Sequence, residues 1–287
     1  MASRRRPKLG QHFLADPRFR RRIVDALPLS QGELVVEIGP GRGAMTGLLV
    51  ERASRVVAIE LDSALVEALR REFHGETHLE VIETDILATD IGQLCRERHA
   101  EKCFVFGNIP YYITSPILHH LFGFHASICG MALLMQYEVA ARLIARPGRR
   151  EYGYLTVLAR AFSSPRLLLQ VPPGAFSPPP QVSSALVGFE MRPPPGALPT
   201  LSDASGLGPG NWDAGEVEQF LGFVQACFAQ KRKRLLNNLG RIYGREAVEV
   251  QLDRVGLAVE TRAEELDVAV LADLFVGLEN CRLTIDD

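Results

Sequence analysis

Nine consecutive residues decide the fold of this chain: Val35-Val36-Glu37-Ile38-Gly39-Pro40-Gly41-Arg42-Gly43. The first four, three of which are apolar, have the pattern of a strand. Glycines then alternate along the loop, and a helical pattern follows from Ala44 to about Arg52. Glycines between a strand and a helix let the backbone approach a ligand closely. The stretch therefore predicts a strand, a ligand-binding loop and a helix.

Apolar runs of strand length recur after this unit. They lie at Val56–Ile59, Leu79–Ile82, Cys103–Gly107 and Ile128–Met135. Asp62 has the position of an N-cap for a helix that reaches about Arg71. Because the runs lack polar alternation and are separated by helical patterns, they predict an α/β fold with a mostly parallel sheet covered on both faces. Strands near 166–171 and 185–190 flank a proline-rich loop and could close the sheet edge as a hairpin.

The composition changes near residue 192. Residues 192–215 are rich in proline and glycine and have no periodicity, which predicts a linker or long loop. From Glu216 to Gly277 the pattern is helical, with room for three to five helices. We therefore expect an α/β domain with a basic N-terminal segment over 1–191 and a small all-α domain over 216–287.

The composition of the 287-residue chain is that of a globular protein, with 47% hydrophobic and 23% charged residues. No apolar run approaches the roughly 18–20 residues of a membrane span, and no apolar segment of a secretory signal follows the basic N-terminus. The five cysteines are widely spaced and form no Cys-x-x-Cys pair. We expect reduced thiols, a cytoplasmic location and neither a metal site nor a disulfide framework.

Positive charge gathers in two places although the formal net charge is −2. The first cluster lies within residues 1–22 and contains Arg4, Arg5, Arg6, Lys8, Arg18, Arg20, Arg21 and Arg22. The second is Lys231-Arg232-Lys233-Arg234. Such clusters suit contacts with phosphates, although a solubilising tail and a solvated helix face are equally compatible with the residues alone.

Acidic residues end two successive predicted strands beside the glycine loop. Glu60 closes the strand that begins at Val56, and Asp85 follows the strand at 79–82. A carboxylate in the first position can accept hydrogen bonds from ribose hydroxyls, and one in the second can accept from an adenine amino group. Each taken singly could be an N-cap or a surface charge, but together they favour a nucleoside pocket.

The nucleoside could belong to NAD or to S-adenosylmethionine, since the glycine loop suits both. The motif Asn108-Ile109-Pro110-Tyr111 follows the strand at 103–107 and favours the second. The Asn108 side-chain oxygen and the Ile109 carbonyl can accept N–H bonds from the exocyclic amine of a flat base, and the Tyr111 ring can stack on it. Alone, the motif could be an ordinary Asn-x-Pro turn. A hydride transferase would need a positioned acid or base, whereas His119 and His120 lie in a helical stretch.

Six stretches resemble a known family from end to end of the chain. They are Leu9–Leu14, Glu37–Gly41, Ile59–Asp62, Gly107–Tyr111, Pro172–Phe176 with Pro178–Pro180, and Arg232–Leu235. In these stretches the chain resembles the bacterial small-subunit rRNA adenine N6-dimethyltransferases, the kasugamycin-sensitivity methyltransferase family. The resemblance implies a Rossmann-like methyltransferase domain and an RNA-facing helical domain.

The resemblance also assigns functional residues. It implies that S-adenosylmethionine is contacted by His12, Leu14, Gly39, Gly41, Glu60, Asp85 and Asn108. It implies catalytic roles for Asn108, Tyr111 and Phe176, with the two aromatic rings sandwiching the target base, although Phe176 could instead be a core aromatic beside the proline-rich loop. The implied substrate is a pair of adjacent adenosines in the hairpin near the 3′ end of small-subunit rRNA, each methylated twice within the assembling ribosomal subunit. We expect no metal, no membrane partner and a monomer.

Three residues depart from the family pattern. His12 stands where the family often has Asn, Ser177 where a second Phe is common, and Gln181 where a Lys is common. The related erythromycin-resistance methyltransferases, which modify a large-subunit rRNA adenosine, share the Asn-x-Pro-Tyr motif. The Pro172–Phe176 and Thr261–Leu266 stretches resemble the dimethyltransferases instead. An inactive RNA-binding assembly factor is a third alternative, against which the intact acidic residues and Asn108 argue.

Overall fold

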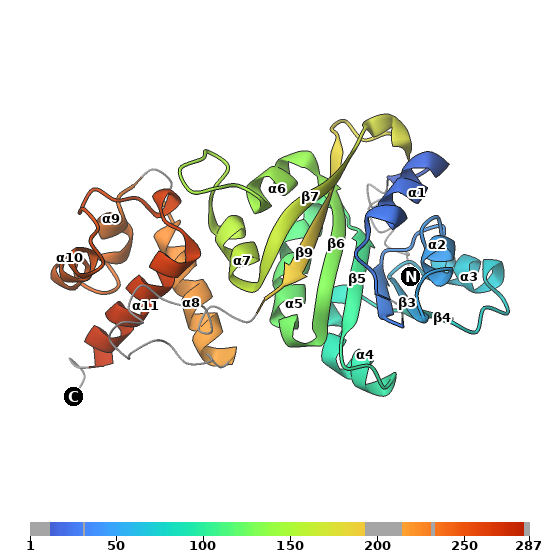
Figure 1. Ribbon diagram of the computed structural model, residues 1–287, viewed down its shortest axis with the longest axis horizontal. Helices are drawn as coiled ribbons and strands as arrows, with labels where there is room; N and C mark the ends of the chain where they lie inside the picture. The colour runs from blue at the N-terminus through green and yellow to red at the C-terminus, as the bar shows by residue number, and fades with distance from the viewer. Residues whose placement is uncertain (1–11, 31, 193–213, 231–232, 284–287) are drawn as a thin grey trace, which may run out of the picture. The chain divides into compact units, whose positions relative to one another are not determined.

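The computed structural model describes residues 12–30, 32–192, 214–230 and 233–283 (Figure 1). The chain divides into two compact units, one formed by residues 1–140 and 164–191 and the other by 141–163 and 192–287. Most of the predicted linker, residues 192–215, lies outside the described residues. Residues 141–163 group with the C-terminal helices, a grouping that hydropathy patterns along the chain do not reveal.

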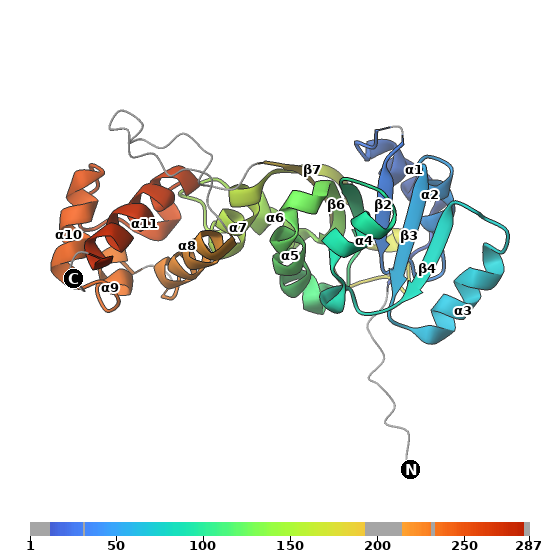
Figure 2. The same ribbon diagram turned by 90° about the horizontal axis from the view of Figure 1, so that it is seen from below.

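A seven-stranded sheet forms the centre of the first unit, in the order β4-β3-β2-β5-β6-β9-β7 (Figure 2). Its strands are β2 (Leu34–Ile38), β3 (Arg55–Glu60), β4 (Leu79–Glu83), β5 (Cys103–Asn108), β6 (Ile128–Gln136), β7 (Ser163–Val171) and β9 (Ser184–Met191). Neighbouring strands from β4 to β6 pair in parallel, and β9 pairs antiparallel with β6. The predicted mostly parallel sheet is confirmed. The strands predicted near 166–171 and 185–190 are β7 and β9, and they form one edge of it.

The parallel register brings several loops to one edge of the sheet. Val36 of β2 lies opposite Val57 of β3 and Val105 of β5, and all three are fully buried. Apolar side chains on both faces of these strands explain the lack of polar alternation in the sequence. Because the strands run in the same direction, the loops after β2, β3, β4 and β5 meet at their carboxyl ends, where open α/β sheets bind ligands.

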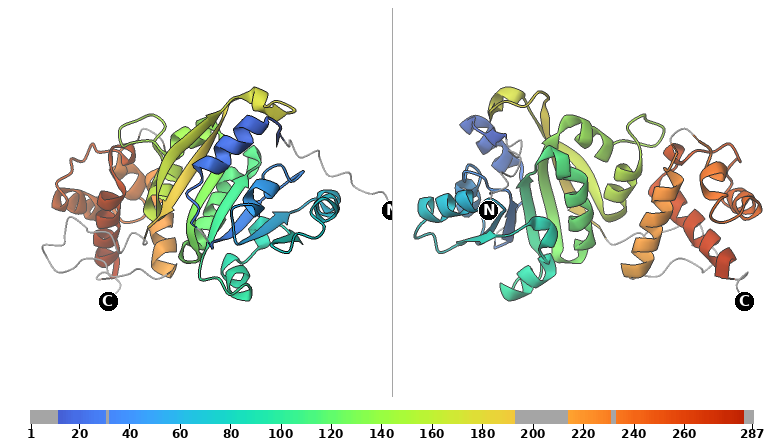
Figure 3. Two further views of the ribbon diagram at one scale, coloured as in Figure 1. Left: turned by 45° about the vertical axis from the view of Figure 1, so that its right-hand side comes forward. Right: turned by 180° about the vertical axis from the view of Figure 1, so that it is seen from behind.

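Helices cover both faces of this sheet (Figure 3). One face carries α1 (Pro17–Ala26) and α2 (Thr46–Val50), and the other carries α4 (Ile91–Glu97) and α5 (Thr114–Gly123). Helix α3 (Ser63–Glu72) begins as predicted, because the Asp62 side chain accepts a hydrogen bond of 2.9 Å from the Ala64 amide. Helix α2 is shorter than the helical pattern from Ala44 to Arg52 predicts.

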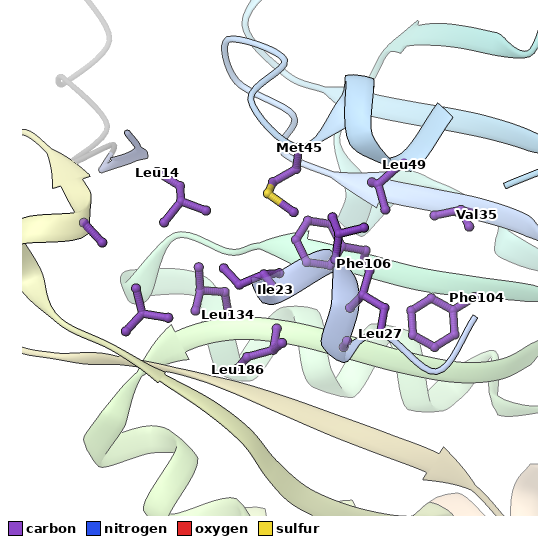
Figure 4. Packing of buried hydrophobic residues seen from close by; sticks show 14 of the residues in the cluster. Leu14, Ile23, Leu27, Val35, Met45, Leu49, Phe104, Phe106, Leu134 and Leu186 are labelled. Atoms are coloured by element: carbon purple, nitrogen blue, oxygen red, sulfur yellow. The ribbon is translucent and has the colours of Figure 1, made fainter. Parts of the chain in front are cut away.

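The core that lies under α1 ties the N-terminal segment to the sheet (Figure 4). Ile23 of α1 and Leu49 of α2 pack with Phe106 of β5, and all three are buried. A two-stranded ladder joins the same core, formed by β1 (Phe13–Leu14) and β8 (Phe176–Ser177) in antiparallel pairing. The segment before α1 is thereby fixed beside the loop that follows β7.

The second unit is helical. Its described residues include α7 (Tyr154–Phe162), α8 (Ala214–Cys227), α9 (Leu235–Leu239), α10 (Arg245–Arg254) and α11 (Val268–Leu283). Phe275 of α11 packs against Phe223 of α8, with ring centroids 5.6 Å apart. The predicted small all-α region is confirmed. No helix in the described part of the chain is long and apolar enough to cross a membrane.

Candidate active site

A pocket opens at the carboxyl ends of β2, β3, β4 and β5, where the predicted loops meet. It is lined by seven of the residues named from the sequence: His12, Gly39, Gly41, Glu60, Asp85, Asn108 and Tyr111. The parallel register brings together the residues that end or follow β2, β3, β4 and β5, and the segment of β1, paired with β8, adds His12.

The Glu60 carboxylate lines the pocket and accepts three hydrogen bonds from main-chain amides. One carboxylate oxygen accepts hydrogen bonds from the amides of Leu61 and Asp62, at 2.9 and 3.1 Å. The other accepts from the Gly41 amide at 3.1 Å. A carboxylate offers about four acceptor sites, so about one remains for a ligand hydroxyl. Glu60 therefore both fixes the glycine loop and keeps capacity for a further bond.

Gly41 leaves room for a residue from the N-terminal segment. Its φ angle is +59°, and a Cβ built on it would lie 2.9 Å from the Phe13 ring. The Arg42 guanidinium lies over the Phe13 ring, 4.8 Å from its centroid. A side chain at position 41 would push Phe13 away and open the pocket wall.

Asp85 lies at the far side of the pocket, after β4. One of its carboxylate oxygens caps the following short helix by accepting from the Leu87 amide at 2.9 Å. Its second oxygen accepts no bond from the residues that the structure describes. Asp85 thus combines the N-cap role with a free acceptor beside the pocket.

The amide of Asn108 has a fixed orientation. Its Nδ2 donates to the main-chain oxygen of His12 at 3.1 Å. This bond uses the donor end of the amide, so Oδ1 stays available as an acceptor. The orientation comes from a residue 96 positions away, which the motif itself does not contain.

A second acceptor belongs to the next residue of the motif. The Ile109 carbonyl receives no hydrogen bond from the described residues, whereas the Pro110 carbonyl accepts from the Ile113 amide at 3.2 Å. The Ile109 amide donates to the Leu134 carbonyl of β6 at 3.1 Å, which fixes the peptide that joins Asn108 to Ile109. The two free acceptors expected from the motif are therefore present.

Two tyrosine side chains line the pocket. The Tyr111 hydroxyl shares a hydrogen bond of 2.7 Å with the buried Ser184 hydroxyl, and its ring stacks on His12 with centroids 5.7 Å apart. Burial raises the pKa of Tyr111, so this hydroxyl stays protonated at neutral pH. Tyr112 also lines the pocket and is 60% exposed. The sequence interpretation missed Tyr112; its signal was the second of two adjacent tyrosines after the proline.

Leu14 and Phe176 are not among the residues that line the pocket. They lie opposite each other in the β1–β8 ladder, and both side chains belong to the hydrophobic core, with Phe176 only 4% exposed. In this conformation Phe176 is the core aromatic that the sequence left as its alternative. A stacking role for its ring requires that the ring become uncovered.

His12 joins the pocket to the loop after β8. Its Nδ1 donates to the Pro178 carbonyl at 2.8 Å, and its main-chain oxygen holds Asn108. One residue thus touches the pocket wall, the Asn108 amide and the proline-rich loop. The donor of this bond is the imidazole Nδ1–H, because the Pro178 carbonyl can only accept.

Glu37, which sequence reasoning did not assign, lies behind the glycine loop on β2. Its side chain is 2% exposed, and one carboxylate oxygen has no hydrogen-bond partner among the described residues. Burial raises the pKa of Glu37 to about 7, and the nearby negative charge of Glu60 adds to the shift. The acidic residue inside the strand was visible in the sequence, but its burial was not.

Among the described residues, this pocket has no cluster of metal ligands and no residue of the two basic clusters in its lining. In the part of the chain that the structure describes, no three His, Cys, Asp or Glu side chains gather where they could hold a metal ion. Arg4, Arg5, Arg6, Lys8, Lys231 and Arg232 lie outside the described residues. Arg234 pairs with Glu260 at 3.6 Å.

The chain is similar to known proteins in its sequence and in its fold. The model of the ribosomal RNA adenine dimethylase family matches residues 2–202. A ribosomal RNA small subunit methyltransferase A from Acidobacterium capsulatum is 42% identical over 98% of this chain and 93% of its own length. The crystal structure of the 23S rRNA methyltransferase ErmE has a TM-score of 0.68 and 27% identity, covering 93% of this chain and 99% of that one. A dimethyladenosine transferase from Plasmodium falciparum has a TM-score of 0.73 and 23% identity, over 94% and 98% of the two chains.

Proposed function

The chain belongs to the ribosomal RNA adenine dimethylase family, and on that premise we propose that it dimethylates N6 of two adjacent adenosines in the hairpin near the 3′ end of small-subunit rRNA. The methyl donor is S-adenosylmethionine. The proposed substrate is the rRNA within the assembling small subunit, and the proposed acting form is a monomer.

The orientation of Asn108 carries this proposal. Its Nδ2 is bound to His12, so Oδ1 and the free Ile109 carbonyl form a pair of acceptors in a pocket with two acidic side chains. A pair of acceptors suits an –NH2 group, which has two N–H donors. It does not suit a ring carbonyl or a phosphate, which have none.

Sequence identity to relatives favours the small ribosomal subunit over the large one as the substrate. The relative named for the small subunit is 42% identical over 281 residues, whereas the large-subunit enzyme ErmE is 27% identical. The shared fold does not separate the two substrates, because both groups have it. The proposal therefore follows the similarity in sequence.

The pocket fits the nucleoside end of S-adenosylmethionine. Glu60 has acceptor capacity left for a ribose hydroxyl, and Asp85 has one free oxygen for an amino group. Ile38, Ile59 and Ile86 add apolar walls. When bound, S-adenosylmethionine supplies an electrophilic methyl group on a sulfonium that is a strong leaving group.

The side chains around the acceptor base act by positioning. The N6 lone pair of adenine is delocalised into the ring, which makes the amine a poor nucleophile. Hydrogen bonds from the amine to Asn108 Oδ1 and to the Ile109 carbonyl favour a more localised lone pair and aim it at the donor site. Tyr111 is protonated and held by Ser184, so it offers a ring face and not a base. Proton loss from the methylated amine can follow to water.

Transfer of a labelled methyl group to ribosomal particles tests the proposal. Undermethylated small subunits, incubated with the protein and tritiated S-adenosylmethionine, should incorporate label, and large subunits should not. Binding to small subunits without transfer would identify the inactive assembly factor, and label in large subunits would identify the erythromycin-resistance type.

We expect Glu60→Ala to weaken S-adenosylmethionine binding by roughly 1–3 kcal/mol, because it removes a charge-assisted acceptor. It also frees the amides of Gly41, Leu61 and Asp62, so the glycine loop loses its anchor. Calorimetry measures the affinity. Glu83→Gln, at the exposed end of β4, is the matched control and should bind normally. Unchanged affinity in Glu60→Ala would identify Glu60 as a strand-end charge without a ligand role.

A further inference from the structure

A groove lies outside the pocket, between α1 and the segment that leads into α2. It has a volume of about 570 Å3 and is lined by Arg18, Arg20, Arg21 and Arg22 together with Ala44 and Leu48. Asp25 is the one acidic residue of the lining, and it is already paired with Arg52. The groove is therefore strongly positive, although the chain as a whole is not.

The four arginines differ in the contacts that they make within the protein. Arg18 pairs with Asp16 at 2.9 Å, and Arg20 donates from Nε to the Leu14 carbonyl at 2.9 Å. Arg22 lies over the Phe19 ring, 5.1 Å from its centroid, and is exposed. Arg21 is exposed and has no acidic partner among the described residues. Arg21 and Arg22 thus carry charge that no carboxylate of the described chain neutralises.

The dipole of α1 does not explain these charges. Positive side chains early in a helix oppose its dipole, and the first turn of α1 contains no acidic residue. The N-cap Asp16 supplies one negative charge at this end of the helix, and it is already paired with Arg18. The helix dipole therefore gives no reason for four arginines within five residues of α1.

The groove is physically tied to the loop that precedes Phe176. The amides of Ala15 and Asp16 both donate to the Ala175 carbonyl, at 2.7 and 3.1 Å. Arg20 holds Leu14, which pairs with Phe176. Figures 1 and 3 show α1 beside this loop. The start of α1 and the loop therefore form one continuous surface next to the pocket.

We propose that the α1 groove binds the phosphodiester backbone of the RNA that flanks the adenosine held in the pocket. The planar guanidinium fork matches phosphate oxygens, and all four basic residues are arginines. Helix α1 has 10 residues and is about 15 Å long. A nucleic acid strand presents one phosphate per about 3.4 Å of duplex, so the helix faces on the order of four phosphates. The groove fixes the position of the RNA and does not read its sequence.

This inference rests on the proposed function and is tested by a pair of variants. Arg21→Gln with Arg22→Gln removes two exposed charges and leaves Arg20, which holds Leu14, in place. Arg55→Gln with Arg96→Gln is the matched control. Arg55 begins β3 and Arg96 lies in the last turn of α4, so both are exposed at the edge where strands begin, opposite the pocket.

The measurement is equilibrium binding of each full-length variant to undermethylated small subunits over a range of salt concentrations. Each phosphate contact contributes about 0.7–0.9 to the slope of log K against log salt, so the α1 pair should reduce the slope by about 1.4–1.8 and the affinity at least about tenfold near 0.1 M salt. The control pair should match the unmodified protein. Affinity for S-adenosylmethionine should be unchanged in both, which also verifies folding.

Equal slopes for the α1 pair and the unmodified protein would overturn the inference. Equal losses in both pairs would overturn it too, because the effect would then follow net charge and not location. Binding is measured without methyl transfer, so a protein that transfers no methyl group would count against the proposed function alone.

Discussion

Asn108→Ala is expected to lower methyl transfer to small subunits by at least about 10²-fold. The substitution removes Oδ1, the acceptor that orients the amine, and leaves the Ile109 carbonyl as a single acceptor. It also removes the Nδ2 bond to His12, so the N-terminal segment loses one tie to the pocket. Rates at saturating concentrations of both substrates isolate the transfer step.

Two controls separate orientation of the amine from other effects. Affinity of Asn108→Ala for S-adenosylmethionine should change far less than the rate, because Glu60 and Asp85 are untouched. Asn108→Asp retains acceptor oxygens but cannot donate to His12, so it should transfer more slowly than the unmodified protein and faster than Asn108→Ala. Near-normal turnover in Asn108→Ala would remove Asn108 from the transfer step.

Glu37→Gln is expected to remove a large part of the pH dependence of stability. In the folded protein the Glu37 carboxyl keeps its proton up to about pH 7, whereas it ionises near its ordinary value of 4.5 in the unfolded chain. The folded state therefore binds this proton more tightly. Its contribution to stability is complete below pH 4.5 and is lost as the pH rises to 7, at about 1.4 kcal/mol per pH unit and about 3 kcal/mol in total.

The measurement is the free energy of unfolding of both proteins by urea at several pH values between 5 and 8. The difference between unmodified protein and Glu37→Gln should fall steadily as the pH rises toward 7. Glu72→Gln, at the exposed end of α3, removes the same charge from the surface and serves as the control. A difference that is constant with pH would contradict the shifted pKa of the buried carboxyl.

The parallel sheet could be predicted because its strands are apolar on both faces and lie between helical patterns. The pocket could be predicted for the same reason, since Glu60 and Asn108 end strands, Asp85 follows one, and parallel strands end at one edge of the sheet. Local sequence was sufficient here, because the polar residue and its strand are adjacent along the chain.

Contacts between distant segments could not be predicted in this way. The two-residue strand β1 is too short to have a hydropathy period, yet it carries His12 to Asn108 and Phe13 to Gly41. The burial of Phe176 depends on α1, which no pattern in the sequence analysis located. The reduced acceptor capacity of Glu60 depends on the backbone amides that its side chain reaches after folding.

The position of the methyl groups on the RNA tests the central claim most directly. Undermethylated small subunits are incubated with the protein and S-adenosylmethionine, and the methylated nucleosides of both ribosomal RNAs are then mapped by mass spectrometry. The proposed function predicts two adjacent N6,N6-dimethyladenosines in the hairpin near the 3′ end of the small-subunit RNA. Methylation of a single adenosine elsewhere, or of the large-subunit RNA when both subunits are offered, would contradict it.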